Sequence, residues 1–397
     1  MLLSLGLIIL LGLALNSIIS RFRIPSLIGY IITGIILGPY VLDLISPNIL
    51  NISSDLRKIA LIVILVRAGL TLDINDLKSV GRGALLLSFL PATFEIIAIG
   101  FISQLFFEIT IIEGLIMGSV VAAVSPAVVV PRMISLIEKK RGTEKAIPQM
   151  VLAASSLDDI YAIVLFTIFI QFYETSVFDF QSILLMPASI ILGVIVGIIL
   201  GLAMQYLFKK FHMRDTIKVL IIFGIAFVLD FLESSLKNIL PFSSLLAIIT
   251  MSLTILKTYP ILAARLTSKF SKIWVFSEMI LFVLIGALVN ITVIGNVGFS
   301  FVLLLVLAII VRFIAVLVST AKLNFNFKER LFIFFSYLPK ATVQAAIGAI
   351  PLQLGMPSGE LILGVSVLSI FITAPLGAIL IDQTQEFLLK RKATLAM

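Results

Sequence analysis

Apolar runs long enough to cross a lipid bilayer recur along almost the whole chain, and they constrain its fold more than any other feature. About 20 consecutive apolar residues cross the hydrocarbon core as a helix. The chain is 60% hydrophobic and 13% charged, and its mean hydropathy is +1.22. Soluble globular domains are only about 45–50% apolar and about 25% charged. The sequence therefore predicts an all-α polytopic membrane protein.

Length and hydropathy predict about thirteen transmembrane helices joined by short loops. The expected spans are residues 2–20, 25–42, 57–72, 83–107, 112–137, 148–171, 183–208, 216–234, 240–256, 275–293, 297–319, 329–352 and 359–382. Most of the 29 Lys and Arg residues fall in the loops on one side. Because cytoplasmic loops carry the excess of basic residues, we expect the N-terminus outside and the C-terminus in the cytoplasm.

Three further expectations concern the organisation of the chain. The basic stretch 257–272 is expected to lie along the inner membrane interface. Residues 1–397 are expected to form a single transmembrane unit, because the loops leave no room for a soluble regulatory domain. Residues 383–397 would be a short cytoplasmic tail.

Five ionisable residues lie in the middle of expected spans, where charge is costly. Asp158 and Asp159 are adjacent in the sixth span, and Glu95, Arg312 and Lys340 lie in three others. Insertion scales put the cost of one Asp at a helix centre at about +2.5 to +3.5 kcal/mol. Such residues persist where a partner or a ligand compensates them, so all five are candidates for a functional site.

Two expected spans carry prolines at mid-membrane depth: Pro126 and Pro131 in the fifth, and Pro339 in the twelfth. Unwound backbone is tolerated in a membrane only inside protein or beside a water-filled cavity. A kink would explain either span alone, but interruptions at corresponding places are typical of inverted repeats, whose broken helices cross at the midplane. We therefore expect repeat one at about 1–171, a linker helix at about 183–208 and repeat two at about 216–382.

The repeat symmetry also predicts an ion pair. Glu95 and Arg312 occupy corresponding spans of the two repeats at similar depth. We expect them to form one buried pair that holds the repeats in register, since arginine stays protonated at any working pH. Reversing both charges should then restore folding better than either single change.

The Asp158–Asp159 pair has different chemistry. Two close carboxylates in a low-dielectric site resist simultaneous ionisation, so the pair can hold a proton or a hard cation. Oxygen ligands suit Na⁺ or Li⁺, and Ser155 precedes the pair while Ser125 lies at the interrupted fifth span. Competition of H⁺ and a cation for one carboxylate, exposed to each side in turn, predicts an antiporter. The alternative is that Lys340 and helix ends merely satisfy both carboxylates.

Five motifs follow one another along the chain: PSLIGYIITGIILGP (25–39), LVRAGLTLD (65–73), AVSPAVVVP (123–131), ASSLDDI (154–160) and LPKATVQAAIG (338–348). In this order they resemble the monovalent cation:proton antiporter superfamily, and most closely the NHA-type sodium/proton exchangers. The resemblance implies the sodium/proton antiporter fold, a homodimer, and a core domain that moves by an elevator-like shift.

The resemblance also implies roles for individual residues. Asp159 would be the main carrier, binding Na⁺ or Li⁺ and H⁺, and Asp158 its companion. Ser125, Ser155 and Thr342 would be nearby oxygen donors, and Lys340 would lie at the helix crossing. Glu95 and Arg312 match the intramembrane pair of the NHA branch.

The expected substrates are Na⁺, Li⁺ and H⁺. The protein is expected to contact membrane lipid, to bind no nucleic acid or cofactor, and to be a transporter rather than an enzyme. The expected location is the plasma membrane of a prokaryote. Related double-Asp bacterial proteins carry a lysine where this chain has Arg312. Because arginine cannot release a proton usefully, one-for-one exchange is slightly favoured.

Three other readings remain open. A potassium/proton exchanger or efflux core shares the fold, although the chain shows no nucleotide-sensing module. A sodium-coupled organic-anion symporter also has crossed broken helices but lacks the Asp pair. An intramembrane aspartyl protease needs its two Asp residues on facing helices, whereas here they are adjacent. With no Cys and one His, thiolate and histidine metal clusters are excluded.

Overall fold

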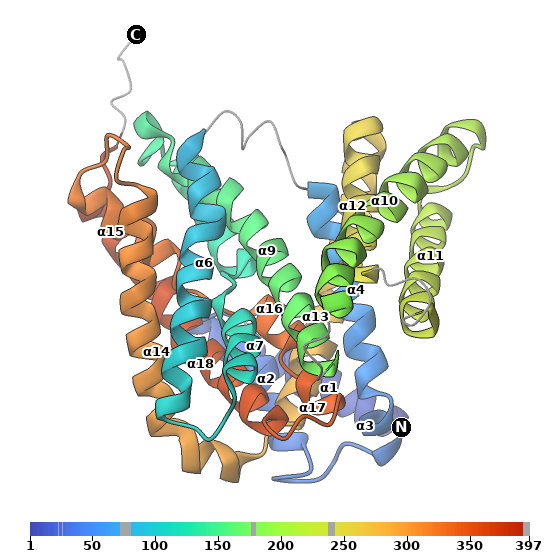
Figure 1. The fold of residues 1–397 in the computed structure, drawn as a ribbon, viewed down its shortest axis with the longest axis horizontal. Coiled ribbons are helices and arrows are strands. Elements are labelled where there is room, and N and C mark those ends of the chain that lie inside the picture. Colours follow the sequence, from blue (N-terminus) through green and yellow to red (C-terminus); the bar gives the residue numbers. More distant parts are fainter. Residues whose placement is uncertain (23, 26, 72–80, 176–179, 237–242, 392–397) are drawn as a thin grey trace. The chain divides into compact units, whose positions relative to one another are not determined.

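The computed structural model describes all residues except 23, 26, 72–80, 176–179, 237–242 and 392–397, and its regular elements are helices (Figure 1). The α-helices are α1 (Leu2–Arg21), α2 (Leu27–Leu37), α3 (Pro47–Asn51), α4 (Ser53–Thr71), α6 (Arg82–Ile102), α7 (Ile111–Ala122), α8 (Pro126–Glu138), α9 (Ile147–Thr175), α10 (Phe180–Lys210), α11 (Asp215–Leu236), α12 (Ser244–Thr258), α13 (Pro260–Ala287), α14 (Ile291–Ser319), α15 (Phe327–Ser336), α16 (Thr342–Ile347), α17 (Ile350–Gln353) and α18 (Gly359–Leu388). Two short 3-10 helices are η1 (Ser103–Leu105) and η2 (Thr143–Lys145).

The predicted all-α class is confirmed. In the described part of the chain the only β pairing is an isolated bridge between Arg141 and Arg391. Eight described helical stretches are long and apolar enough to cross a membrane. The total of about thirteen spans and the orientation of the termini stay predictions. The last two residues of the 65–73 motif and the end of the 383–397 tail lie outside the described residues.

The chain divides into two compact units. Unit 1 comprises Met1–Ser54, Asp73–Phe169 and Leu281–Met397, and unit 2 comprises Asp55–Leu72 and Ile170–Ile280. Every candidate site residue named from the sequence belongs to unit 1. Unit 1 therefore contains all the groups from which the site can be built.

In unit 1, α6 packs along α7 and α14, and α18 packs against α14 and α15 (Figure 1). Gly118 allows α7 to approach α6 closely, because a Cβ there would lie 2.8 Å from the carbonyl oxygen of Ile96. An apolar cluster packs α8, α9 and α15 together, and its buried members include Val129, Met133, Val151, Phe332 and Tyr337. These contacts fix the helices that carry the candidate site.

In unit 2, α12 packs against α10 and α11. An ion pair joins α4 to α11, with Nζ of Lys58 2.8 Å from Oδ2 of Asp230. The expected span 275–293 begins earlier than predicted, since α13 runs without a break from Pro260 to Ala287. Most of the basic stretch 257–272 is therefore part of this helix, and its position at the inner interface stays a prediction. Proline favours the first position of a helix, and no further Pro or Gly occurs before Gly286.

Candidate functional site

Two helices of unit 1 are interrupted, and their interruptions touch. Helix α7 ends at Ala122, and the backbone is extended at Ala123 and Ser125 before α8 begins at Pro126. Helices α15 and α16 are separated by residues 337–341, which include Pro339. The backbone N–H of Ser125 donates a hydrogen bond to the carbonyl of Pro339 at 2.8 Å. The two unwound segments therefore meet in direct backbone contact.

The three prolines expected at the breaks play different parts. Pro126 occupies the first turn of α8, where its missing N–H costs nothing, and Pro339 lies within the second break. Pro131 lies inside α8, which stays helical through it. Its expected role as a helix breaker is therefore corrected: the chain unwinds before Pro126, and Pro131 removes only one hydrogen bond from a continuing helix.

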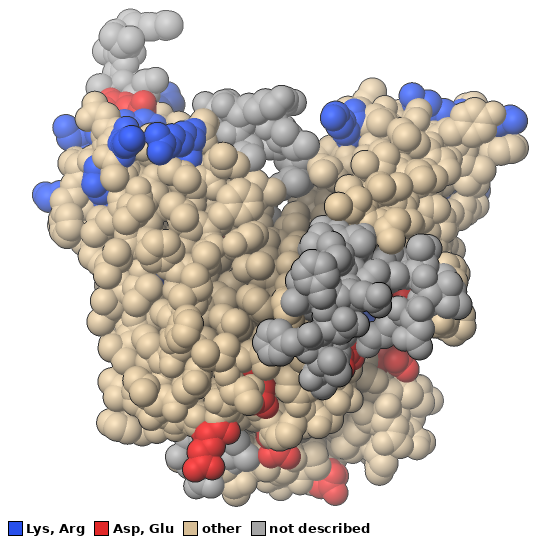
Figure 2. All heavy atoms as spheres, in the orientation of Figure 1, with Lys and Arg blue, Asp and Glu red and all other residues tan. Residues whose placement is uncertain are grey.

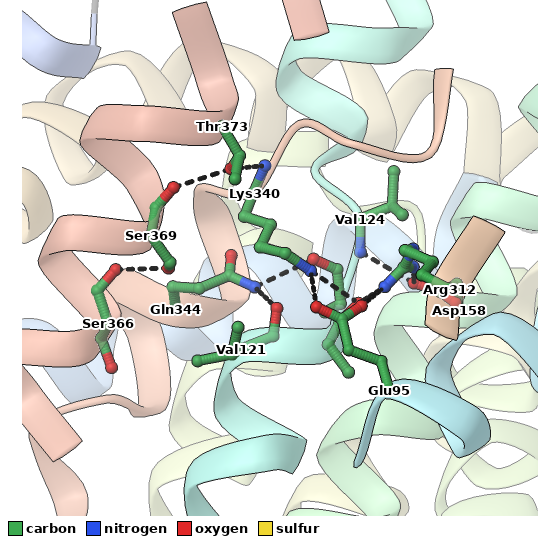
Figure 3. Close-up of polar contacts among 12 residues, drawn as sticks. Glu95, Val121, Val124, Asp158, Arg312, Lys340, Gln344, Ser366, Ser369 and Thr373 are labelled. Atoms are coloured by element: carbon green, nitrogen blue, oxygen red, sulfur yellow. Dashed lines mark hydrogen bonds and ion pairs between the residues drawn. The ribbon is translucent and has the colours of Figure 1, made fainter. Parts of the chain in front are cut away.

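A fully buried charge cluster lies beside the crossing. The Glu95 carboxylate of α6 pairs with Nη1 of Arg312 from α14, and its other oxygen lies 2.8 Å from Nζ of Lys340. Nη2 of Arg312 is 3.8 Å from Oδ2 of Asp158 on α9. All four residues are 0% exposed. Figure 3 shows Lys340 and Arg312 approaching Glu95 from opposite sides.

The same two cations bind the end of α7. A helix leaves its last four carbonyl groups without partners inside the helix. The carbonyl of Ala122 accepts a hydrogen bond from Nη1 of Arg312 at 2.6 Å and lies 3.5 Å from Nζ of Lys340. Positive charge is favourable at a helix C-terminus because of the helix dipole. Arg312 and Lys340 therefore stabilise α7 where it unwinds.

The two adjacent aspartates have different surroundings. Oδ2 of Asp158 accepts a hydrogen bond from the backbone N–H of Val124 at 2.8 Å and faces Arg312. Asp159 makes no ion pair with any described residue, and its buried Oδ1 has no hydrogen-bond partner there. Asp159 is 7% exposed, whereas Asp158 is 0% exposed. The structure thus holds the carboxylate of Asp158 in place, whereas that of Asp159 has no cationic side chain paired with it in the described part of the chain.

Two of the three predicted oxygen donors lie at helix ends beside the breaks, and the third lies within α9. Ser125 is the N-cap of α8 and Thr342 is the first residue of α16. Both are buried, and neither hydroxyl has a hydrogen-bond partner among the described residues. Ser155 donates to the carbonyl of Leu152, one turn earlier in α9, at 3.2 Å. Its oxygen lone pairs remain available as acceptors.

The chemistry of these donors fits a hard monovalent cation. The available ligands are carboxylate, hydroxyl and carbonyl oxygens, which suit hard ions. The described residues include no group of three or more His, Cys, Asp or Glu side chains able to hold a metal ion. The arrangement can therefore bind a proton or a weakly held alkali cation at one free carboxylate.

Sequence reasoning missed three features of the site. The amine of Lys340 pairs with Glu95, a partner that the sequence did not indicate. The guanidinium of Arg312 lies over the ring of Tyr337, 5.8 Å from its centroid. The amide of Gln344 donates to the carbonyls of Val121 and Ala123, where α7 ends. The one available signal for Gln344 was an amide within the apolar run that follows Pro339.

Several known proteins are similar to this chain in sequence. A family model described as "Sodium/hydrogen exchanger, transmembrane" matches residues 6–384. Human sodium/hydrogen exchanger 9B2 is 33% identical over 386 residues, covering 93% of this chain and 70% of the human protein. The mouse 9B2 exchanger is 36% identical over 386 residues, covering 90% of this chain and 67% of the mouse protein.

A solved structure is also similar. The sodium proton antiporter MjNhaP1 of Methanocaldococcus jannaschii at pH 8 matches with a TM-score of 0.78 and 20% identity, covering 97% of this chain and 96% of that chain. At this identity the likeness shows the fold alone. It confirms the antiporter fold predicted from the sequence.

Proposed function

The chain belongs to the sodium/hydrogen exchanger family, and from this premise we propose that it is a sodium/proton antiporter whose carrier is Asp159. The family supports cation/proton antiport in general, as the resemblance of the motifs predicted. The assignment of Asp159 rests on one observation: it is a buried carboxylate without an ion pair among the described residues, next to an aspartate that is held in place.

Charge balance in the buried cluster supports competition between Na⁺ and H⁺. When all five groups are ionised, the negative charges of Glu95, Asp158 and Asp159 exceed the positive charges of Arg312 and Lys340 by one. Uncompensated charge at low dielectric is costly. One Na⁺ or one H⁺ restores neutrality, and both cannot bind the same carboxylate. This balance favours one-for-one exchange.

The site residues then have separate tasks. Ionised Asp159 binds Na⁺ or Li⁺, with the hydroxyl oxygens of Ser125, Ser155 and Thr342 as further ligands. Protonated Asp159 is neutral and releases the cation. Asp158 stays bound to the Val124 N–H and Arg312, so it shapes the site without leaving it. Alternating exposure of Asp159 to the two sides couples the two fluxes.

The membrane orientation can be proposed from the charge on unit 1. The protein is an integral membrane protein, and Figure 2 shows Lys and Arg side chains of unit 1 gathered at the end where α6 and α15 begin. Because cytoplasmic ends carry the basic excess, this end would face the cytoplasm. That places the end of α18 inside. We further propose that each chain contains two inverted repeats, and that the protein forms a homodimer in the plasma membrane of a prokaryote.

A cation screen in proteoliposomes tests the proposed function. Purified protein is reconstituted with an internal pH dye, and Na⁺, Li⁺ or K⁺ is added outside with the membrane voltage clamped or free. We expect Na⁺ and Li⁺ to drive H⁺ efflux at a rate that the voltage does not change. A response to K⁺ alone, or none to any cation, would contradict the proposal.

A matched pair of variants assigns the carrier. Asp159→Asn should abolish exchange while the protein still inserts and stays folded. Asp382→Asn makes the same substitution in α18, where the carboxylate pairs with Arg132 and is 39% exposed. It should leave exchange intact, because exposed pairs contribute only about 0–1 kcal/mol. Normal exchange by Asp159→Asn would remove Asp159 from the carrier role.

A further inference from the structure

Gln344 connects the second broken helix to the first through both hydrogens of its amide. It lies in the first turn of α16 and is 0% exposed. Its Nε2 donates to the carbonyl oxygens of Val121 at 3.0 Å and Ala123 at 2.9 Å. Figure 3 shows its side chain extending from α16 toward the end of α7. A neutral amide thus satisfies two carbonyls on either side of Ala122.

One of these carbonyls belongs to the peptide group that binds Asp158. The C=O of Ala123 and the N–H of Val124 are part of the same planar peptide unit, and in a trans peptide they point in opposite directions. The C=O accepts from Gln344, and the N–H donates to Oδ2 of Asp158 at 2.8 Å. Gln344 and Asp158 therefore bind opposite sides of one peptide group.

The second break has a similar arrangement. The C=O of Pro339 accepts from the N–H of Ser125 at 2.8 Å, and the N–H of Lys340, in the same peptide group, donates to Oγ1 of Thr373 at 3.1 Å. Thr373 in turn donates to the carbonyl of Ser369 in α18. Each unwound segment thus contains a peptide group that is hydrogen-bonded on both sides. The N–H of the group bound by Gln344 donates to a carboxylate of the site, whereas the N–H of the other group donates to a hydroxyl.

We propose that Gln344 is a positioning residue for Asp158, which it orients through the Ala123–Val124 peptide group, and that it thereby sets the affinity for the transported cation. The proposal rests on the proposed function, since it assumes that the cation binds beside Asp158. Donation to the C=O fixes the direction of the N–H and polarises it, because hydrogen bonds in a chain strengthen one another.

Other side chains cannot replace this amide. Two hydrogens on one neutral nitrogen are found in Gln and Asn side chains, and Asn is one methylene shorter. Methionine has a similar length and no donor. Gln344→Met should therefore leave the carbonyls of Val121 and Ala123 without these bonds and release the peptide group that orients Asp158.

The test compares Na⁺ affinity with maximal rate. Gln344→Met should raise the apparent KM for Na⁺ about 10-fold or more, as is usual when a partner in the outer shell of a cation site is removed. The maximal rate should change much less. Gln344→Asn serves as a second variant, because its amide reaches at most one carbonyl, and should also raise KM. Gln385→Met is the matched control, since the one partner of its amide nitrogen among the described residues is the backbone carbonyl of Asp382 in its own helix.

A binding measurement separates positioning from general destabilisation. The thermal stability of each purified protein is measured without and with Na⁺. The Na⁺-dependent increase should need about 10-fold more Na⁺ in Gln344→Met than in the wild type and Gln385→Met. In an Asp158→Asn background, where the charge to be positioned is gone, Gln344→Met should add little further effect on KM.

The outcomes distinguish the two proposals. Unchanged Na⁺ affinity in both Gln344 variants, with Na⁺ stabilising the wild type, would overturn the role of Gln344 alone. Equal effects of Gln344→Met with and without Asp158→Asn would also overturn it. If Na⁺ neither stabilised nor was exchanged by the wild type, the proposed function would fail, and the role of Gln344 with it.

Discussion

Replacing Glu95 with glutamine tests the buried charge cluster most severely. Glu95 is the shared counter-charge of Arg312 and Lys340, which bind its two carboxylate oxygens. Glu95→Gln keeps the shape of the side chain but removes its charge. The other carboxylate paired with one of these cations is that of Asp158, whose Oδ2 lies 3.8 Å from Nη2 of Arg312. Two buried cations would then share one more distant partner.

The distances give the size of the effect. At 2.8 Å and an effective dielectric constant of about 20, the attraction between Lys340 and Glu95 amounts to about 6 kcal/mol. Desolvation offsets part of this gain, and breaking a buried pair by removing one partner costs about 3–5 kcal/mol. Because Glu95 serves two cations, we expect a loss near the upper end of this range.

Unfolding in mixed micelles of a mild detergent and dodecyl sulfate measures this loss. Glu95→Gln should unfold at clearly lower dodecyl sulfate than the wild type. Adding Lys340→Gln should recover more than half of the loss, because one unpaired cation is removed as well. Wild-type stability of Glu95→Gln, or a double variant no better than the single one, would refute this reasoning.

The structure also changes the expected outcome of charge reversal. The sequence predicted that exchanging the charges of Glu95 and Arg312 would restore folding better than either single change. Lys340 lies 2.8 Å from Glu95, so an arginine placed there would face a second cation. Rescue is now expected only when Lys340 is neutralised at the same time.

Two further predictions concern packing and the carrier. Gly377→Ala should destabilise the protein by about 1–3 kcal/mol and slow exchange, because the new Cβ would lie 2.5 Å from Cγ of Pro339 at the crossing. Thermal unfolding measures the loss of stability, and a flux assay measures the exchange rate. Gly224→Ala, with no atom within 4 Å of the new Cβ, should be neutral or stabilising by about 0.5–1 kcal/mol, and destabilisation by it would contradict the packing argument. Asp159→Asn should bind no Na⁺ in a thermal-shift titration, and a wild-type response would contradict its role.

The sequence predicted those parts of the site where the residue type alone shows that a free-energy cost must be compensated. Charges at mid-span depth identify Asp158, Asp159, Glu95 and Arg312 because burial of charge is expensive. Proline marks the breaks before Pro126 and around Pro339, since it removes a backbone donor. The corresponding positions of Glu95 and Arg312 in the two expected repeats also indicated that they would form a pair, and the structure places them in contact.

The missed features depend on side-chain reach and on neutral groups. Lys340 has several rotatable bonds, and its position in the chain does not say which carboxylate its amine will reach. Gln344 carries no charge, so burial leaves no clear signal in the sequence. Pro131 shows the reverse error: proline lowers helix stability, but packing holds α8 helical through it. The sequence placed the start of one span at residue 275, whereas α13 begins at Pro260, because basic side chains lower the local hydropathy without interrupting a helix.

The most direct test of the central claim is the number of protons released when Na⁺ binds to the purified protein. Na⁺ is titrated in weakly buffered detergent solution with a pH-sensitive dye, across neutral pH, for the wild type and Asp159→Asn. Competition for one carboxylate predicts at most one proton released per bound Na⁺ in the wild type and none in the variant. Na⁺ binding without proton release, or equal release by Asp159→Asn, would contradict exchange at Asp159.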